Sequence, residues 1–166
     1  MKRLLGFGIL KIFILSCSQL EKRSESSIFF NTETFLRDTL FIQSQFMECG
    51  EFGGHLELSK VYLKGKDFYI NYQKFDADCN SINQNKGKPV QKLVKSVTRK
   101  ISNSDKGMIC DYMHKLLDAR FDGVTPSQAG NIFQVMNCDK SICISVYPGS
   151  LKISNRYSKL IAGLVR

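Results

Sequence analysis

A glycine-rich stretch between two strand-like runs constrains the fold of this chain more than any other feature. The stretch covers residues 49–57 (Cys-Gly-Glu-Phe-Gly-Gly-His-Leu-Glu) and holds three of the twelve glycines and one of the two histidines. Alternating apolar residues precede it at 39–48 and follow it at 56–63, a pattern typical of half-buried strands. We therefore expect a turn between two antiparallel strands, with the glycines supplying positive φ angles or a bulge.

A third strand is predicted at 68–75, where Phe68, Ile70 and Tyr72 alternate with polar residues. The reversal before it, at 64–67, has Gly65 at its first central position, which favours a type II′ hairpin. Three strands joined by two short turns form an antiparallel meander.

The second half of the chain mixes helix and strand signals. Residues 90–101 have apolar residues at helical spacing but are rich in β-branched side chains, which favours a strand over the alternative helix. A helix is predicted at 102–122, where Ser102 and Asp105 form a capping box before an apolar stripe. A short helical turn at 125–128, strands at 131–138 and 142–147, and a terminal helix at 155–165 complete the pattern.

These elements predict an α+β fold with an antiparallel sheet of five or six strands and two helices packed on one face. The expected core residues are Leu40, Ile42, Phe46, Leu56, Leu58, Phe68, Ile70, Tyr72, Ile109, Met113, Leu116, Leu117, Val135, Ile144, Leu160 and Ile161.

The N-terminus predicts export. Lys2 and Arg3 precede an apolar run at 4–15, as in a secretory signal, and the run is shorter than the ~20 apolar residues that cross a bilayer. Residues 14–17 (Ile-Leu-Ser-Cys) are similar to the lipobox of bacterial lipoproteins, in which the cysteine becomes the acylated N-terminus. We therefore expect a lipoprotein signal peptide at 1–17 with lipidation of Cys17. Ordinary cleavage of a secreted protein and a buried helix of a cytosolic protein are the alternatives.

After the signal, a polar segment at 18–30 predicts a flexible tether, and residues 31–166 predict a single globular domain. The formal charge of +9 falls to +6 without the three cations of the signal. The predicted signal and lipidation site place the protein in the bacterial cell envelope, anchored to a membrane and facing the periplasm or the exterior. This location, together with the moderate charge, argues against a nucleic-acid partner.

An exported chain is permitted to form disulfides. Five cysteines remain after Cys17, so at least one is left outside an intramolecular pair. Cys49 and Cys79 lie at the same end of the predicted meander, which makes them one expected pair. Cys138 and Cys143 flank a four-residue reversal and are the second. Cys110 borders the apolar stripe of its helix and is expected to be a buried thiol.

Glu51, His55 and Glu57 make the glycine stretch a candidate polar site. Together with Cys49 they supply the ligand types that zinc prefers, but their spacing matches no established zinc pattern, so we predict no metal and no cofactor. A nucleophilic cysteine would need a histidine base and an orienting third group. No such third group accompanies either possible pair, Cys49 with His55 or Cys110 with His114, so catalytic residues remain unassigned.

Six cations lie within residues 86–100: Lys86, Lys88, Lys92, Lys95, Arg99 and Lys100. On an exposed edge strand such residues prevent pairing with other chains. The functional alternative is a basic face for anionic lipid, lipopolysaccharide or an acidic protein partner.

The Cys-Gly-Glu-Phe-Gly-Gly-His string behind a lipobox resembles a group of small uncharacterised bacterial envelope lipoproteins, which carry Cys-Gly-Glu-aromatic-Gly-Gly-His at the same point. The resemblance covers the signal and the first half of the domain. It implies export and acylation, and it assigns no mechanism. We expect a lipid-anchored, non-catalytic binding protein. The alternatives are a small envelope hydrolase or metal-dependent enzyme that uses Glu51, His55 and Glu57, and an immunity or inhibitor protein against a toxin or lytic enzyme.

Overall fold

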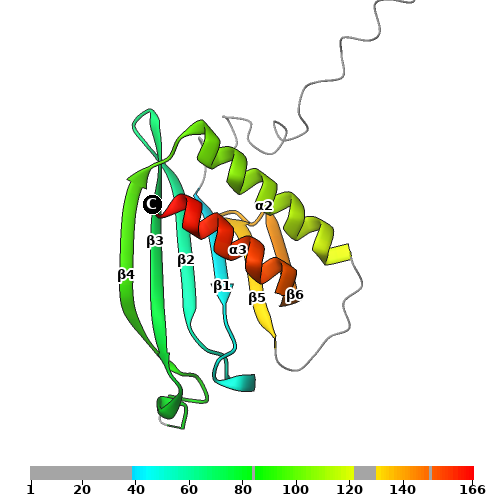
Figure 1. Cartoon of the computed structure of the whole chain (residues 1–166). Helices are drawn as coiled ribbons and strands as arrows, with labels where there is room; N and C mark the ends of the chain where they lie inside the picture. Colours follow the sequence, from blue (N-terminus) through cyan, green and yellow to red (C-terminus); the bar gives the residue numbers. More distant parts are fainter. Residues whose placement is uncertain (1–38, 84, 122–129, 150) are drawn as a thin grey trace, which may run out of the picture.

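The computed structural model of the chain describes residues 39–83, 85–121, 130–149 and 151–166. In this part of the chain it has the predicted α+β fold, a six-stranded antiparallel sheet with two helices (Figure 1). The strands are β1 (Leu40–Gln45), β2 (Leu56–Lys64), β3 (Asp67–Asp78), β4 (Val90–Lys100), β5 (Asn131–Asn137) and β6 (Cys143–Gly149). The helices are α2 (Asn103–Phe121) and α3 (Leu151–Leu164), and two short 3-10 turns are η2 (Gly50–Phe52) and η3 (Cys79–Ser81). Cys17, the predicted signal and tether, and the short helical turn predicted at 125–128 lie outside the described residues.

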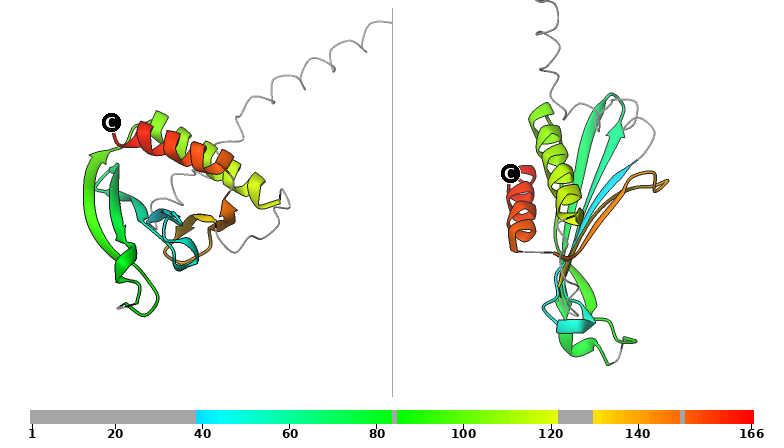
Figure 2. Two further views of the ribbon diagram at one scale, coloured as in Figure 1. Left: turned by 60° about the horizontal axis from the view of Figure 1, so that its bottom comes forward. Right: turned by 90° about the vertical axis from the view of Figure 1, so that its right-hand side faces the viewer.

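The sheet has the strand order β4-β3-β2-β1-β5-β6. The predicted three-strand meander therefore extends to a fourth strand, β4, while β5 returns to pair with β1 on the other side. Both helices cover the same face of the sheet, which curves around them (Figure 2). β4 and β6 are the two edges, and the end of the sheet that holds η2 and η3 projects beyond the helices (Figure 2).

Residues 90–100 form a strand, so the helical alternative for this segment is wrong. β4 pairs with β3 from Tyr69↔Lys100 to Asp78↔Val90, with one register shift between Lys74 and Phe75. The apolar residues that gave the helical spacing do not share a buried face, because Val90, Leu93 and Val94 are all exposed. The preference of β-branched residues for strands decided the local structure.

Two predicted local motifs are present. Gly65 has a φ of +66° in the hairpin that pairs Lys64 with Asp67, as the first central position of a type II′ turn requires. At the start of α2, the Ser102 Oγ accepts from the N–H of Asp105 at 3.2 Å, and the Asp105 carboxylate accepts from the N–H of Ser102 at 2.7 Å. These reciprocal bonds are the predicted capping box.

The core lies between the helices and the sheet. It contains Leu40, Ile42, Ile70 and Tyr72 as predicted, together with Ile109, Met113 and Leu116 of α2 and Leu160 of α3. The prediction was wrong for Leu56 and Leu58, which are partly exposed on the opposite face of the sheet. The register explains the error, since Ile42 pairs with Ser59 and Leu40 with Val61, so the buried positions of β2 are 57, 59 and 61.

Candidate functional site

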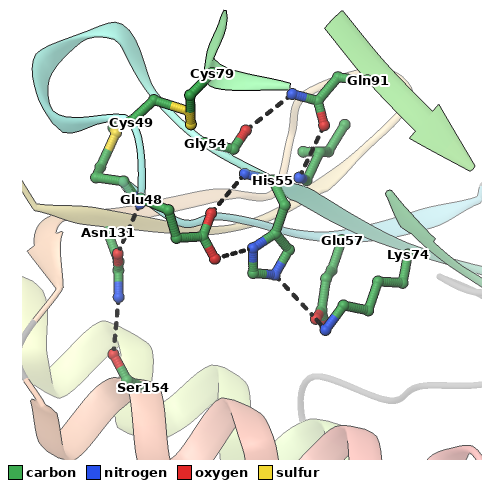
Figure 3. Close-up of polar contacts among 12 residues, drawn as sticks. Glu48, Cys49, Gly54, His55, Glu57, Lys74, Cys79, Gln91, Asn131 and Ser154 are labelled. Carbon is green, nitrogen blue, oxygen red and sulfur yellow. Dashed lines mark hydrogen bonds and ion pairs between the residues drawn. A yellow bond between two sulfur atoms is a disulfide. The ribbon is translucent and has the colours of Figure 1, made fainter. Parts of the chain in front are cut away.

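The glycine stretch connects β1 to β2 at the projecting end of the sheet, and a disulfide ties it to the end of β3. Cys49 and Cys79 are bonded, with their Cα atoms 5.4 Å apart and a sequence separation of 30. This confirms the predicted pair. Closing a loop of that length stabilises a fold by about 3–4 kcal/mol. Figure 3 shows the bond beside the polar contacts of the turn.

The second predicted disulfide is absent, so that prediction was wrong. Cys138 and Cys143 are not bonded to one another. The strand register gives the reason: Cys143 is the first residue of β6 and lies opposite Met136, whereas Cys138 falls in the reversal after β5 ends at Asn137. The two thiols therefore do not face each other across the hairpin.

Two glycines of the stretch are required by its geometry. Gly53 has a φ of +97°, which side chains rarely allow. At Gly54, a Cβ atom would lie 2.2 Å from the carbonyl oxygen of Phe46, so no larger residue fits without moving the backbone. The close approach at Gly54 brings the backbone of His55 next to the carboxylate of Glu48.

The imidazole of His55 lies between two carboxylates (Figure 3). Glu48 accepts a hydrogen bond from the backbone N–H of His55 at 2.8 Å and also contacts Nδ1 of its ring. The other ring nitrogen, Nε2, lies 3.3 Å from Glu57 Oε1. One face of the ring stacks on Phe46, with the ring centroids 4.4 Å apart. Both nitrogens and one face of His55 are therefore engaged inside the protein.

Glu57 carries this network to the covered face of the sheet. Its carboxylate is buried and lies 3.4 Å from Nζ of Lys74, its neighbour on β3. Burial, together with the negative charge of Glu57, raises the pKa of Tyr72 and that of Tyr157. The hydroxyl of Tyr157 makes no hydrogen bond among the residues that the structure describes. The phenols therefore stay neutral beside the carboxylate.

Sequence reasoning placed one residue wrongly in this network and missed others. Glu51 is exposed in η2 and does not contact His55. Glu48, instead of Glu51, is the carboxylate bonded to His55 in the turn. Asn131 was also missed: it accepts from the N–H of Met47 at 3.1 Å and donates to Ser154 Oγ at 3.3 Å, which links the turn to α3. Glu48 and Asn131 reach this network only through the path of the turn, so their spacing in the sequence does not predict their contacts.

The geometry does not assemble a nucleophile or a metal centre from the predicted residues. Cys49 is held in the disulfide, and burial raises the pKa of Cys110 to about 11, which keeps its thiol protonated. No three His, Cys, Asp or Glu side chains within the described ranges are placed to hold a metal ion. An open groove of about 550 Å³ runs between α2 and α3, lined in part by Asp111, Lys115, Arg156 and Lys159, and it contains neither His55 nor Glu57.

The predicted basic patch divides into two parts. Arg99 turns inward, where it makes two hydrogen bonds to Asp105 at 2.9 and 3.0 Å and one to the carbonyl of Leu164. Lys100 pairs with Asp67 at 2.8 Å. By contrast, Lys86, Lys88, Lys92 and Lys95 are exposed and form no ion pair within the described part of the chain.

Exposed apolar side chains lie among these four lysines. Val90, Leu93 and Val94 are 48%, 48% and 47% exposed on the same edge strand. We call the surface formed by these three residues and Lys86, Lys88, Lys92 and Lys95 the basic edge. Among the residues that the structure describes, it combines positive charge outside ion pairs, exposed apolar area and a strand with no neighbour on one side.

None of the helices described here is long and apolar enough to cross a membrane. Comparison of the chain with protein-family models, curated proteins and solved structures finds no match.

Proposed function

We propose that this protein is a lipid-anchored, non-catalytic component of the cell envelope that binds an anionic partner through the basic edge. The observation that carries the proposal is a contrast among the cations of β4 and of the segment just before it. Arg99 and Lys100 are used in ion pairs with Asp105 and Asp67, whereas Lys86, Lys88, Lys92 and Lys95 form no ion pair within the described residues, although Lys92 lies opposite Asp76 in the ladder. Uncompensated charge on one surface attracts partners of the opposite sign.

Exposed apolar area supports a binding role for the same surface. Scattered single apolar residues are normal on protein surfaces, but Val90, Leu93 and Val94 lie within five positions of one edge strand. An edge protected only against aggregation needs lysines and gains nothing from apolar side chains between them. The combination favours a surface that a partner covers.

The glycine turn supports a binding protein over a hydrolase. A general base must reach a substrate with at least one free nitrogen, and both nitrogens of His55 already contact carboxylates. The ring is also stacked on Phe46, and the adjacent Cys49 is crosslinked. These contacts fit a structural role for Glu48, His55 and Glu57 at the base of the sheet.

The lipid anchor in this proposal rests on residues 14–17. Metabolic labelling with palmitate tests it in the full chain and in Cys17→Ala. We expect label and membrane fractionation for the parent chain and neither for the variant. A variant that is still labelled and still sediments with membranes would show that Cys17 is not the site of acylation.

The binding role is tested by capture of envelope components on the full chain. We expect the variant with Lys86, Lys88, Lys92 and Lys95 all changed to Glu to lose the captured component. The matched control reverses four other exposed lysines, Lys60, Lys64, Lys66 and Lys152, and should retain it. Equal capture by both variants would refute the basic edge as the binding surface. The chemical identity of the component separates a lipid from an acidic protein such as a toxin or a lytic enzyme.

A further inference from the structure

We infer that the occupant of the basic edge is an extended acidic segment of another protein, which adds as a further strand beside β4. This inference rests on the proposed function and names the class of its partner. It follows from three features of β4: the direction of its backbone groups, the faces on which its side chains lie, and the sign of its charge.

The backbone of β4 has a row of N–H and C=O groups that pair with no other strand in the described part of the chain. The N–H of Ile101 donates to the carbonyl of Phe68 at 2.9 Å, which makes these two residues a hydrogen-bonded pair of the ladder. Hydrogen-bonded and non-hydrogen-bonded pairs alternate along antiparallel strands. The N–H and C=O groups of Ser96 and Thr98 and the N–H of Lys100 therefore point away from β3, toward the open side of the sheet, whereas the Lys100 carbonyl accepts from the Arg99 guanidinium at 3.0 Å. Such a row binds an added strand.

Lys92 and Lys95 of β4 lie on one face of the strand and Leu93 lies on the other, while Val90, opposite Asp78, shares the face of the lysines. Lys92 lies opposite Asp76 and Lys95 opposite Lys74, so both lysines are on the face that carries the helices. Leu93 lies opposite Phe75, on the other face. Successive residues of a strand point to opposite faces. A partner strand that alternates acidic and apolar residues would thus set its carboxylates beside the lysines and its apolar residues beside Leu93.

The charge of β4 selects among possible occupants. A second copy of this chain would place lysines against lysines, and like charges directly opposite each other destabilise a pair of strands. An anionic membrane would satisfy the lysines but not the row of outward N–H and C=O groups. An acidic extended segment satisfies both, so the observations favour it.

The test measures binding of a fluorescent eight-residue peptide that alternates Glu and Val to the full chain. Ser96→Pro removes one outward N–H while leaving the ladder to β3 intact, because proline is tolerated at an edge position whose N–H faces solvent. Ser96 is exposed, and Ser96→Ala is its matched control. We expect Ser96→Pro to weaken peptide binding about tenfold and Ser96→Ala to leave it unchanged. Lys92→Glu with Lys95→Glu should abolish it. Thermal melting of each variant confirms that the fold is retained.

Two outcomes would overturn strand addition, and they are separable from failure of the proposed function. In the first, the peptide binds the parent chain and Ser96→Pro equally well. In the second, the parent chain does not bind the peptide but binds phosphatidylglycerol vesicles, and the lysine reversals abolish this vesicle binding. In both cases the basic edge remains a binding surface and the partner class is wrong. If neither probe binds, and envelope capture is also insensitive to the lysine reversals, the proposed function itself is refuted.

Discussion

Two charged clusters lie at opposite ends of the sheet, and they are stabilised in different ways. At one end Arg99 donates two hydrogen bonds to the carboxylate of Asp105. Asp105 is 7% exposed and also accepts from the N–H and the hydroxyl of Ser102. At the other end His55 lies between Glu48 and Glu57, but the side chain of Glu48 is 52% exposed and a disulfide crosslinks the turn. Both clusters contain a buried carboxylate, Asp105 and Glu57, but the second also has a half-exposed partner, Glu48, and a covalent crosslink.

The difference shows where a polar network contributes to folding and where it mainly fixes local shape. A buried, fully hydrogen-bonded ion pair is strongly coupled to the fold, since removing one partner leaves the other desolvated. Contacts near the surface exchange readily with water and contribute less. The Arg99 cluster joins β4, α2 and the end of α3, whereas the His55 cluster joins the glycine turn to the neighbouring strands β2 and β3. Mutations at the two ends should therefore change the free energy of unfolding by different amounts.

The largest effect is expected at Asp105. Asp105→Ala leaves the partly buried Arg99 guanidinium unpaired and removes half of the capping box, so the free energy of unfolding should fall by about 3–5 kcal/mol. Urea denaturation measures the change. Asp105→Asn keeps a hydrogen-bonding side chain at the cap and should cost less. A loss below ~1 kcal/mol for Asp105→Ala would mean that the pair is solvent-screened and that the two clusters do not differ.

Loss of the disulfide should have the second-largest effect. Replacing both Cys49 and Cys79 by Ser opens a loop of 30 residues and should lower the free energy of unfolding by about 2–4 kcal/mol. Reduction of the parent chain should lower it by a similar amount and leave the double variant unchanged. A shift of the double variant on reduction would indicate another disulfide in the chain.

The pH dependence of stability should separate the two ends. The hydrogen bonds from Arg99 lower the pKa of Asp105 to about 2, below its value near 4 in the unfolded chain. A carboxyl whose pKa is lower in the folded state stabilises the fold above the unfolded pKa. The shift contributes about 2 kcal/mol to the free energy of unfolding. This contribution should be present at neutral pH and disappear as the pH falls from about 5 through 2. Urea denaturation at several pH values should show this loss in the parent chain and a smaller loss in Asp105→Asn.

The sequence predicted best those features whose signals are local. The capping box needs only the spacing of Ser102 and Asp105, and the hairpin at 64–67 needs only Gly65 in its first central position. Strand alternation placed Cys49 and Cys79 at one end of the meander and so identified their bond. In each case the interacting residues are neighbours in sequence or at the ends of adjacent strands.

The features that the sequence did not reveal depend on register and on distant contacts. Leu58 was expected in the core because apolar residues usually mark the buried face, but the pairing of β2 with β1 buries Ser59 instead. Arg99 looked like a member of a surface patch, since its contacts with Asp105 and Leu164 appear only after α2 and α3 have packed. The choice of Glu48 over Glu51 as the partner of His55 depends on the path of the chain through the glycine turn.

The smallest effect is expected at His55, and it decides what the glycine turn is for. His55→Ala removes a ring that contacts Glu48, Glu57 and Phe46, and it leaves the buried carboxylate of Glu57 with a single ion-pair partner, Lys74. If the cluster is structural, the free energy of unfolding should fall by about 1–2 kcal/mol, because a buried acceptor loses a hydrogen-bonding partner. Glu51→Ala is the control, since Glu51 is exposed on the same turn and should change stability by less than ~0.5 kcal/mol. The disulfide offers a further check: His55 and Cys49 hold the same turn, so the effect of His55→Ala should differ between oxidised and reduced protein. If His55→Ala leaves unfolding unchanged in both states, the imidazole does not stabilise the fold, and its position between two carboxylates would then have to serve a ligand or a reaction.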